Sequence, residues 1–273
     1  MRPSIALALF VISTVGGACS GPRTNASPAS GAAWWSIAAL VPPPGAEEVL
    51  IGGRIADTKD FPASFYAVRG VERCTSTMVG PRTLLTAAHC VDDGAMINLT
   101  LEAREYPGQC VHAPDYKMNH TADWALCLMA QDVPSHPYET LNVDSHTLAV
   151  GVELLLSGFG CTRPRGGGND GVYRIGEARV IKLPSATKHE LVTRGEVALC
   201  YGDSGGPAFV FLDAGKTKRV QVAVNAQGNI HDTSYLAPLS AEAAKRFLYD
   251  WSRRYDVWIC GLHTEAPRCR IGS

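Results

Sequence analysis

Short apolar runs separated by turn residues make up most of the chain after residue 50. The runs are rich in Val, Leu, Thr and Tyr. Between the runs Gly and Pro are frequent, and regular helical periodicity is scarce along the chain. Runs of this kind are typical of β-strands. The pattern therefore predicts an all-β protein.

One stretch near the C-terminus departs from this pattern. In SAEAAKRFLYDWSRRYDVW, residues 240–258, Phe247, Leu248 and Trp251 recur on one helical face. Ser240 has the side chain of an N-cap residue. We expect a terminal helix that buries this apolar face and leaves its Lys and Arg side chains in solvent.

The first eighteen residues have the arrangement of an export signal. Arg2 gives a positive end, residues 5–15 are apolar, and Gly16, Gly17 and Ala18 resemble a cleavage site. The apolar run is too short to be read as a membrane span. We expect an exported protein, either secreted or periplasmic.

The segment after the signal mixes Ser, Pro, Gly and Ala without a period. Such a composition is typical of a linker or pro-segment. We divide the chain into a signal peptide (1–18), a linker or pro-segment (19–49) and one main domain (50–273). Trp34 and Trp35 leave two interpretations open: they pack on the domain, or they are lost with the pro-segment.

The charges of the 273-residue chain are nearly balanced, with 25 Lys and Arg against 26 Asp and Glu. This balance gives no indication of a nucleic-acid partner or of an anionic membrane surface. The histidines show no metal-ligand spacing, so we expect neither a metal nor a cofactor. The sequence carries no signal for an oligomeric state.

Nine cysteines in an exported chain predict disulfides with one cysteine left over. Cys19 follows the small residues of the signal directly, as does the lipidated cysteine of bacterial lipoproteins. Gly16 stands where such signals carry an aliphatic residue. Two alternatives stay open: a lipid anchor on Cys19 that tethers the protein to a membrane, or ordinary signal cleavage.

The segment GDSGGP, residues 202–207, has two interpretations. Gly, Asp, Ser and Pro are the usual residues of a polar turn. Alternatively, Ser204 is a nucleophile on a sharp corner, with the amides of Gly202 and Ser204 aimed at one point as an oxyanion hole. A serine nucleophile needs a base, and the base needs an orienting partner.

The best candidates for these two groups are His89 and Asp123. An apolar strand runs into His89, and a bridge between Cys74 and Cys90 would fix the imidazole. Asp123 begins another apolar strand, where a buried carboxylate would need a partner such as an imidazole N–H. The remaining histidines lie in loop-like surroundings and are expected on the surface: His112, His120, His136, His146, His189, His231 and His263.

LTAAHC, ADWALCLM and GDSGGP, in this order, resemble the three signature segments of the chymotrypsin (trypsin-like) serine peptidase family. The similarity extends from about Leu50 to Trp251. It implies two six-stranded antiparallel β-barrels, an active site between them, and a terminal helix docked on the second barrel. It also implies that His89 is the general base and acid, Asp123 its orienter, and Ser204 the nucleophile that acts on protein or peptide substrates.

The segment EEVLIGGR resembles the family's activation site, with Leu50 as the first mature residue. In the family the new α-amine inserts beside the residue that corresponds to Asp203. Val49 stands before the cut, so a trypsin-like activator should not cleave there. Two alternatives stay open: a zymogen that cuts itself after Val49, or a domain that is never cleaved and is latent or differently ordered.

The resemblance also implies a non-tryptic specificity pocket. Ala198, six residues before Ser204, stands where tryptic members carry Asp. Aligned without gaps, Gln227 and Thr233 occupy places where open-pocket members carry glycine. A narrowed, uncharged slot predicts cleavage after small aliphatic residues such as Ala or Val rather than after Lys or Arg.

The usual family partner of Cys200 is missing, because no cysteine occurs between Cys200 and Cys260, and a Cys161–Cys200 bridge would replace it. Cys110–Cys127 could join neighbouring strands, and Cys260–Cys269 would close a small C-terminal loop. They leave Cys19 alone, although spacing cannot prove connectivity. Two alternatives to a broad peptidase also stay open. One is a catalytically silent binding protein on the same fold, and the other is a processing protease with one target.

Overall fold

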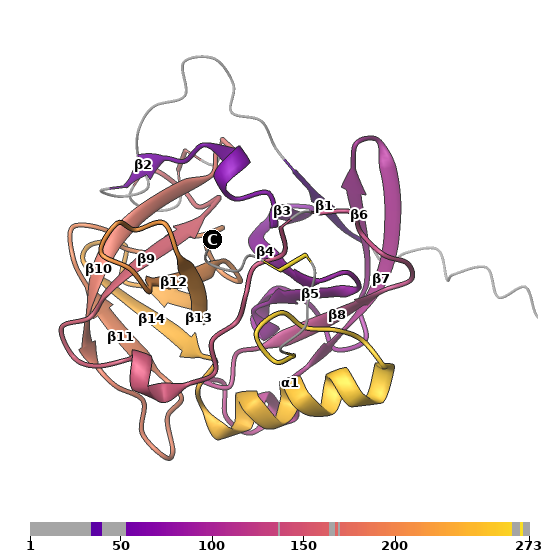
Figure 1. Ribbon diagram of the computed structural model, residues 1–273. Helices are drawn as coiled ribbons and strands as arrows, with labels where there is room; N and C mark the ends of the chain where they lie inside the picture. The colour runs from indigo at the N-terminus through magenta and orange to yellow at the C-terminus, as the bar shows by residue number, and fades with distance from the viewer. Residues whose placement is uncertain are drawn as a thin grey trace, which may run out of the picture. The chain divides into compact units, whose positions relative to one another are not determined.

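The computed structural model describes residues 34–39, 53–135, 137–163, 167–168, 170–263 and 268–269. These residues form two β-barrels and one α-helix (Figure 1). The prediction of an all-β chain with a C-terminal helix is confirmed. The signal peptide, Cys19, Val49 and Leu50 lie outside the described residues. Among the described residues, no helix has both the length and the apolar character needed to cross a membrane.

The first barrel closes through seven strands rather than six. Around the barrel they are β1 (Trp35–Ala38), β3 (Ser64–Arg69), β4 (Glu72–Gly80), β5 (Thr83–Thr86), β8 (Ala125–Met129), β7 (Arg104–His112) and β6 (Met96–Leu101). All neighbours are antiparallel except β1 and β6, which are parallel.

Strand β1 comes from the segment that we expected to be a linker. Trp35 and Ile37 are 1% and 2% exposed, while Ser36 between them is exposed, as the alternation of a strand requires. Trp35 therefore packs on the domain, whereas Trp34 is 41% exposed. Folded structure begins before the expected boundary at residue 50.

The second barrel contains six strands closed by the pairing of β10 with β11. The short strand β2 (Arg54–Ile55) pairs antiparallel with the beginning of β10. The six strands in order are β11 (Leu191–Arg194), β14 (Thr233–Pro238), β13 (Arg219–Gly228), β12 (Pro207–Phe211), β9 (Glu153–Gly158) and β10 (Arg174–Lys182). Single 3₁₀ turns occur at η1 (Thr58–Asp60), η2 (Ala88–Cys90), η3 (Pro114–Lys117) and η4 (Ser145–Thr147).

Helix α1 (Glu242–Tyr255) buries the predicted apolar face, because Phe247, Leu248 and Trp251 are at most 7% exposed. They belong to the same apolar cluster as the core of the first barrel, so the expected docking on the second barrel is wrong. The predicted N-cap is also wrong. The helix begins at Glu242, which makes Ala241 the N-cap and leaves Ser240 one residue too early.

A buried ion pair ties the connection between the barrels to the second barrel. Arg219 Nη2 lies 2.5 Å from Glu139 Oε1, and both side chains are at most 7% exposed. The guanidinium also lies 3.8 Å from the ring centre of Phe61. Burial of both charges makes this contact sensitive to the loss of either partner.

Candidate active site

His89 and Asp123 are brought together by the pairing of their strands. His89 lies in η2, directly after β5, and Asp123 lies just before β8, where Ala125 is in register with Thr86. His89 Nδ1 is 2.6 Å from Asp123 Oδ2, and the His89 backbone N–H donates to Asp123 Oδ1 at 2.9 Å. The carboxylate therefore holds both the ring and the backbone of one residue.

This contact determines what the imidazole can do. Asp123 is 4% exposed, so its carboxylate needs the donors that His89 provides. Nδ1 beside a carboxylate carries the proton, which leaves Nε2 as the basic nitrogen. The His89 side chain is 36% exposed, and Nε2 lies 3.9 Å from Cys90 Sγ.

Ser204 lies in the tight turn that precedes β12. Gly205 in this turn has φ +83°, and a Cβ there would be 2.2 Å from the carbonyl oxygen of Thr75. Only glycine fits such a position. Gly202, at φ +107°, also has a conformation that favours glycine. The glycines of GDSGGP thus permit a sharp corner beneath Ser204.

Two amides of this turn are left without acceptors. The N–H groups of Asp203, Gly205 and Gly206 donate to carbonyl oxygens at 2.8 to 3.0 Å. Among the contacts of the described residues, the N–H groups of Gly202 and Ser204 donate to none. A pair of free amides, one two residues before a serine and one of the serine itself, is what an oxyanion hole requires.

Ser204 is not bonded to His89 in this structure. Its Oγ donates instead to the carbonyl oxygen of Ala226 at 3.3 Å, and no hydrogen bond joins it to His89 among the described contacts. The two residues nevertheless line the same two cavities. Catalytic hydrogen bonds are often long or unformed without substrate.

The carboxylate of Asp203 is fully buried beneath the turn. Its two oxygens accept from the amides of Gly160 at 2.8 Å and Cys200 at 2.9 Å. Burial raises the pKa of Asp203 to about 6, although these amides and Arg174 oppose the shift. Ionised Asp203 therefore needs a further positive partner. The expected one, the α-amine of Leu50, lies outside the described residues.

Thr75 is a site residue that the sequence analysis missed. Its Oγ1 donates to the carbonyl of Gly202 at 2.8 Å and accepts from the amide of Phe159 at 3.1 Å. Its own N–H donates to the carbonyl of Ser204 at 2.7 Å. A residue of the first barrel therefore holds the nucleophile turn of the second. In the sequence, the one indication of this role is that Thr75 directly follows Cys74.

One cavity of about 340 Å³ opens beside Ser204 on the side of β13. Gln227 lines it, as expected. Ala198 and Thr233 do not: Ala198 is fully buried, and Thr233 turns its hydroxyl to Asp232 at 2.8 Å. Separately, β13 shifts its register against β14 between Asn225 and Gln227, which a gap-free alignment cannot detect.

Other residues form the walls of this cavity. They include Leu199, Gly228 and Ile230. A Cβ on Gly228 would be 2.1 Å from the carbonyl oxygen of Leu199, so the two walls touch. The lining residues include no Asp or Glu.

Four disulfides join the pairs named above: Cys74–Cys90, Cys110–Cys127, Cys161–Cys200 and Cys260–Cys269. The first flanks His89 and the third braces the segment before Ser204. Cys74, His89 and Cys90 lie close together. The two sulfurs are bonded to each other, so they are not thiolate ligands for a metal.

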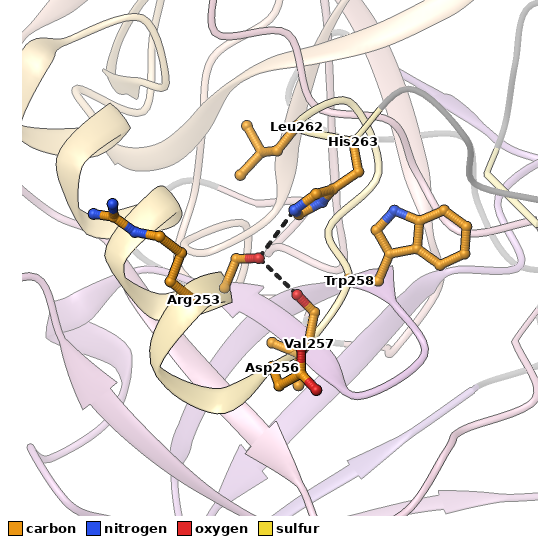
Figure 2. Close-up of a pocket in the computed structure, with 7 residues that line it drawn as sticks. Arg253, Asp256, Val257, Trp258, Leu262 and His263 are labelled. Carbon is orange, nitrogen blue, oxygen red and sulfur yellow. Dashed lines mark hydrogen bonds between the residues drawn. The ribbon is translucent and has the colours of Figure 1, made fainter.

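A larger cavity, of about 650 Å³, lies at the end of α1 and also contains a serine and a histidine (Figure 2). Ser252 Oγ donates to the carbonyl of Val257 at 2.7 Å and is 3.2 Å from His263 Nε2. His263 Nδ1 faces the backbone of Ile259 rather than a carboxylate. Among the described residues, no carboxylate contacts His263.

Ser204 and the His89–Asp123 pair share a cavity, an arrangement that resembles the site of a serine hydrolase. The family model described as Trypsin matches residues 50–229. The chain belongs to the trypsin family, and it is a serine-type endopeptidase.

Several curated proteins are similar to this chain. Serine protease SP24D of Anopheles gambiae is 26% identical over 184 residues, 59% of this chain and 67% of its own length. Seminase of Drosophila melanogaster is 25% identical over 197 residues, covering 63% and 72%. A trypsin-like protease of Streptomyces glaucescens is 26% identical over 230 residues, covering 74% and 82%.

Proposed function

We propose that the protein is an exported endopeptidase that cleaves peptide bonds through an acyl-enzyme on Ser204. The observation that carries this proposal is the double contact of Asp123 with His89, at 2.6 and 2.9 Å, in the cleft that contains Ser204. A carboxylate so placed fixes the imidazole with Nε2 toward the nucleophile.

The reaction has two halves. Ser204 Oγ attacks the carbonyl carbon while its proton passes to His89 Nε2, and the amides of Gly202 and Ser204 receive the oxyanion. The imidazolium then protonates the leaving amine, whose bond to the carbonyl carbon breaks. Water attacks the acyl-enzyme with His89 as base, which releases the acid and restores Ser204. Asp123 accepts the hydrogen bond from His89 Nδ1 throughout.

This mechanism requires Ser204 Oγ to leave the Ala226 carbonyl and turn toward His89. We assign the change to activation. Cleavage after Val49 gives Leu50 an α-amine, and its ammonium pairs with Asp203 beneath the turn. The domain organisation that follows is signal 1–18, pro-segment 19–49 and peptidase 50–273.

The cavity beside Ser204 supports cleavage after small aliphatic residues. Contact between Gly228 and Leu199 limits its depth, and Leu199 and Ile230 make it apolar. Its lining residues offer no carboxylate to pair with Lys or Arg. Val49 satisfies this preference, so the enzyme is its own candidate activator.

Export agrees with the cysteine chemistry. Four disulfides are typical of an oxidising compartment outside the cytoplasm. The choice between a free secreted form and a lipid anchor on Cys19 rests on the sequence alone.

A panel of acyl-tetrapeptide p-nitroanilides that differ only in the last residue tests this function. We expect kcat/KM to be highest with Ala or Val and lowest with Lys or Arg, and Ser204→Ala to abolish the signal. Activity that survives Ser204→Ala, or a preference for Lys or Arg, contradicts the proposal.

A further inference from the structure

The segment ahead of the proposed activation site forms a complete part of the first barrel. We infer that strand β1 stays bound after cleavage, and that its Trp35 forms a wall of the subsite for the leaving-group side of the substrate. This inference rests on the proposed function of Ser204, but its first test does not depend on that function.

Strand β1 is paired along both edges. It is in antiparallel register with β3 from Ser36 to Ala38 and in parallel register with β6 from Trp35 to Ala38. Among the described strands, β3 and β6 have no pairing with each other. Loss of β1 would open the barrel and expose two unpaired strand edges.

The strand also supplies core side chains. Trp35 and Ile37 belong to the apolar cluster that contains Phe65, Ile97 and Leu99. The guanidinium of Arg69, on the neighbouring strand β3, lies 5.1 Å from the centre of the Trp35 ring. Removal of the strand would leave a cavity in a closed core.

The cut after Val49 would separate β1 from β2 along the chain. These strands belong to different barrels, β1 to the first and β2 beside β10 of the second. Breaking one peptide bond between them removes no strand pairing. The mature enzyme would then consist of two chains held without a covalent bond.

Trp35 also reaches the active site. It lines a cavity of about 450 Å³ together with His89, Ser204 and the Cys74–Cys90 bridge. This cavity shares only His89, Tyr201 and Ser204 with the one formed by Leu199 and Gly228. If the acyl side of the substrate fills the Leu199 cavity, the leaving-group side fills this one.

The chemistry of this second cavity favours an apolar residue directly after the scissile bond. The indole and the disulfide offer apolar surface, and Glu72 and Arg73 stand at its rim. The indole N–H of Trp35 is buried and has no hydrogen-bond partner among the described residues. A substrate in this cavity would therefore meet the edge of the Trp35 ring rather than its N–H.

The first test uses an added, site-specific protease. In full-length Ser204→Ala protein, residues 46–49 are replaced by its recognition sequence, and the protein is cut and examined by native size-exclusion chromatography and denaturing mass spectrometry. We expect the fragment that contains β1 to elute with the peptidase chain in equal amounts. Elution of that fragment apart from the peptidase chain overturns the inference, whether or not self-cleavage occurs.

A pair of strand variants sharpens this test. Ile37→Asp places an unpaired charge in the core and should release most of the fragment after the cut. Ser36→Asp, on the exposed side of the same strand, should retain it. If Ile37→Asp fails to fold, the result with the unchanged strand still decides the matter.

The second test separates binding from folding. We measure kcat/KM of the active enzyme on two substrates, a peptide that extends beyond the scissile bond and a p-nitroanilide, and compare them as the ratio of the first value to the second. Trp35→Phe should lower this ratio roughly threefold to tenfold, because the smaller ring offers the leaving-group side of the substrate less apolar surface. Trp34→Phe, at the exposed neighbour, is the matched control. Equal loss on both substrates would mean that Trp35 serves the fold alone.

Discussion

Gly160 and Asp203 lie closer together than any side chain on residue 160 would allow. A Cβ added to Gly160 would be 2.2 Å from Asp203 Oδ2, and the Gly160 amide donates to Asp203 Oδ1 at 2.8 Å. The position of the carboxylate beneath the nucleophile turn therefore depends on the absence of a side chain in a neighbouring loop.

Gly160→Ala should displace Asp203 and, with it, the amides of Gly202 and Ser204. Loss of an oxyanion donor costs about 10²-fold to 10³-fold in kcat, so we expect a decrease of at least roughly tenfold for partial displacement. The measurement is kcat on a p-nitroanilide. Gly167→Ala is the control, because its Cβ would meet Arg163 at an ordinary 3.4 Å. An unchanged kcat for Gly160→Ala would contradict this account of the turn.

The uncut protein should lose stability as the pH rises through the pKa of Asp203. Burial raises this pKa to about 6 in the folded state, above the ordinary 3.8. The protonated form is therefore favoured by folding. Protonated Asp203 contributes up to about 3 kcal/mol to the free energy of unfolding. This contribution is complete below about pH 3.8 and is lost as the pH rises through about 6.

Thermal unfolding of uncut Ser204→Ala protein between pH 4 and 7 measures this effect against the Ser204→Ala, Asp203→Asn double variant. The double variant should gain stability relative to its parent as the pH rises. A difference that is independent of pH would show that Asp203 is already paired with a cation before the cut.

Leu199→Ala should change the substrate preference by deepening the cavity beside Ser204. Leu199 is 2% exposed and is one of the residues that line this cavity, where its backbone carbonyl approaches Gly228. We expect the ratio of kcat/KM for Leu over Ala before the scissile bond to rise roughly tenfold, since a methylene or two in an apolar pocket has about this value. Ile181→Ala, on the exposed side of β10, is the control. No change in the ratio would place the specificity pocket elsewhere.

Glu139→Gln should destabilise the fold strongly. It leaves Arg219 as a buried charge without its carboxylate, which costs about 3–5 kcal/mol. Glu242→Gln removes the carboxylate from an exposed pair with Lys245 and should change the free energy of unfolding far less, because water screens this pair. Urea unfolding of both variants makes the comparison, and similar small values for both would contradict the prediction.

The contact of His89 with Asp123 could be anticipated because each residue adjoins a buried strand that is visible in the sequence. The turn around Ser204 was equally visible, since its glycines and Asp203 are concentrated in five positions. Strand β1 was hidden, because Trp35 and Ile37 are the only inward residues of a four-residue strand in a segment of turn composition.

Two further site features depend on the three-dimensional arrangement. The partners of β1 lie about 30 and 60 residues further along the chain, so no local pattern indicates their pairing. The close approach of Gly228 to the carbonyl oxygen of Leu199 and the register shift of β13 against β14 also have no signal in the sequence. Thr75 acquires its role only when the two barrels meet, because its hydrogen bonds with Gly202, Phe159 and Ser204 all join it to the second barrel.

The most direct test of the central claim is the reaction of the protein, matured without added protease, with a fluorophosphonate. Intact mass and peptide mapping are compared for wild type, Ser204→Ala and Ser252→Ala. We predict one adduct, on Ser204, in wild type and Ser252→Ala and none in Ser204→Ala. An adduct on Ser252, or none on a chain that begins at Leu50, would contradict the assignment of Ser204 as the activated nucleophile.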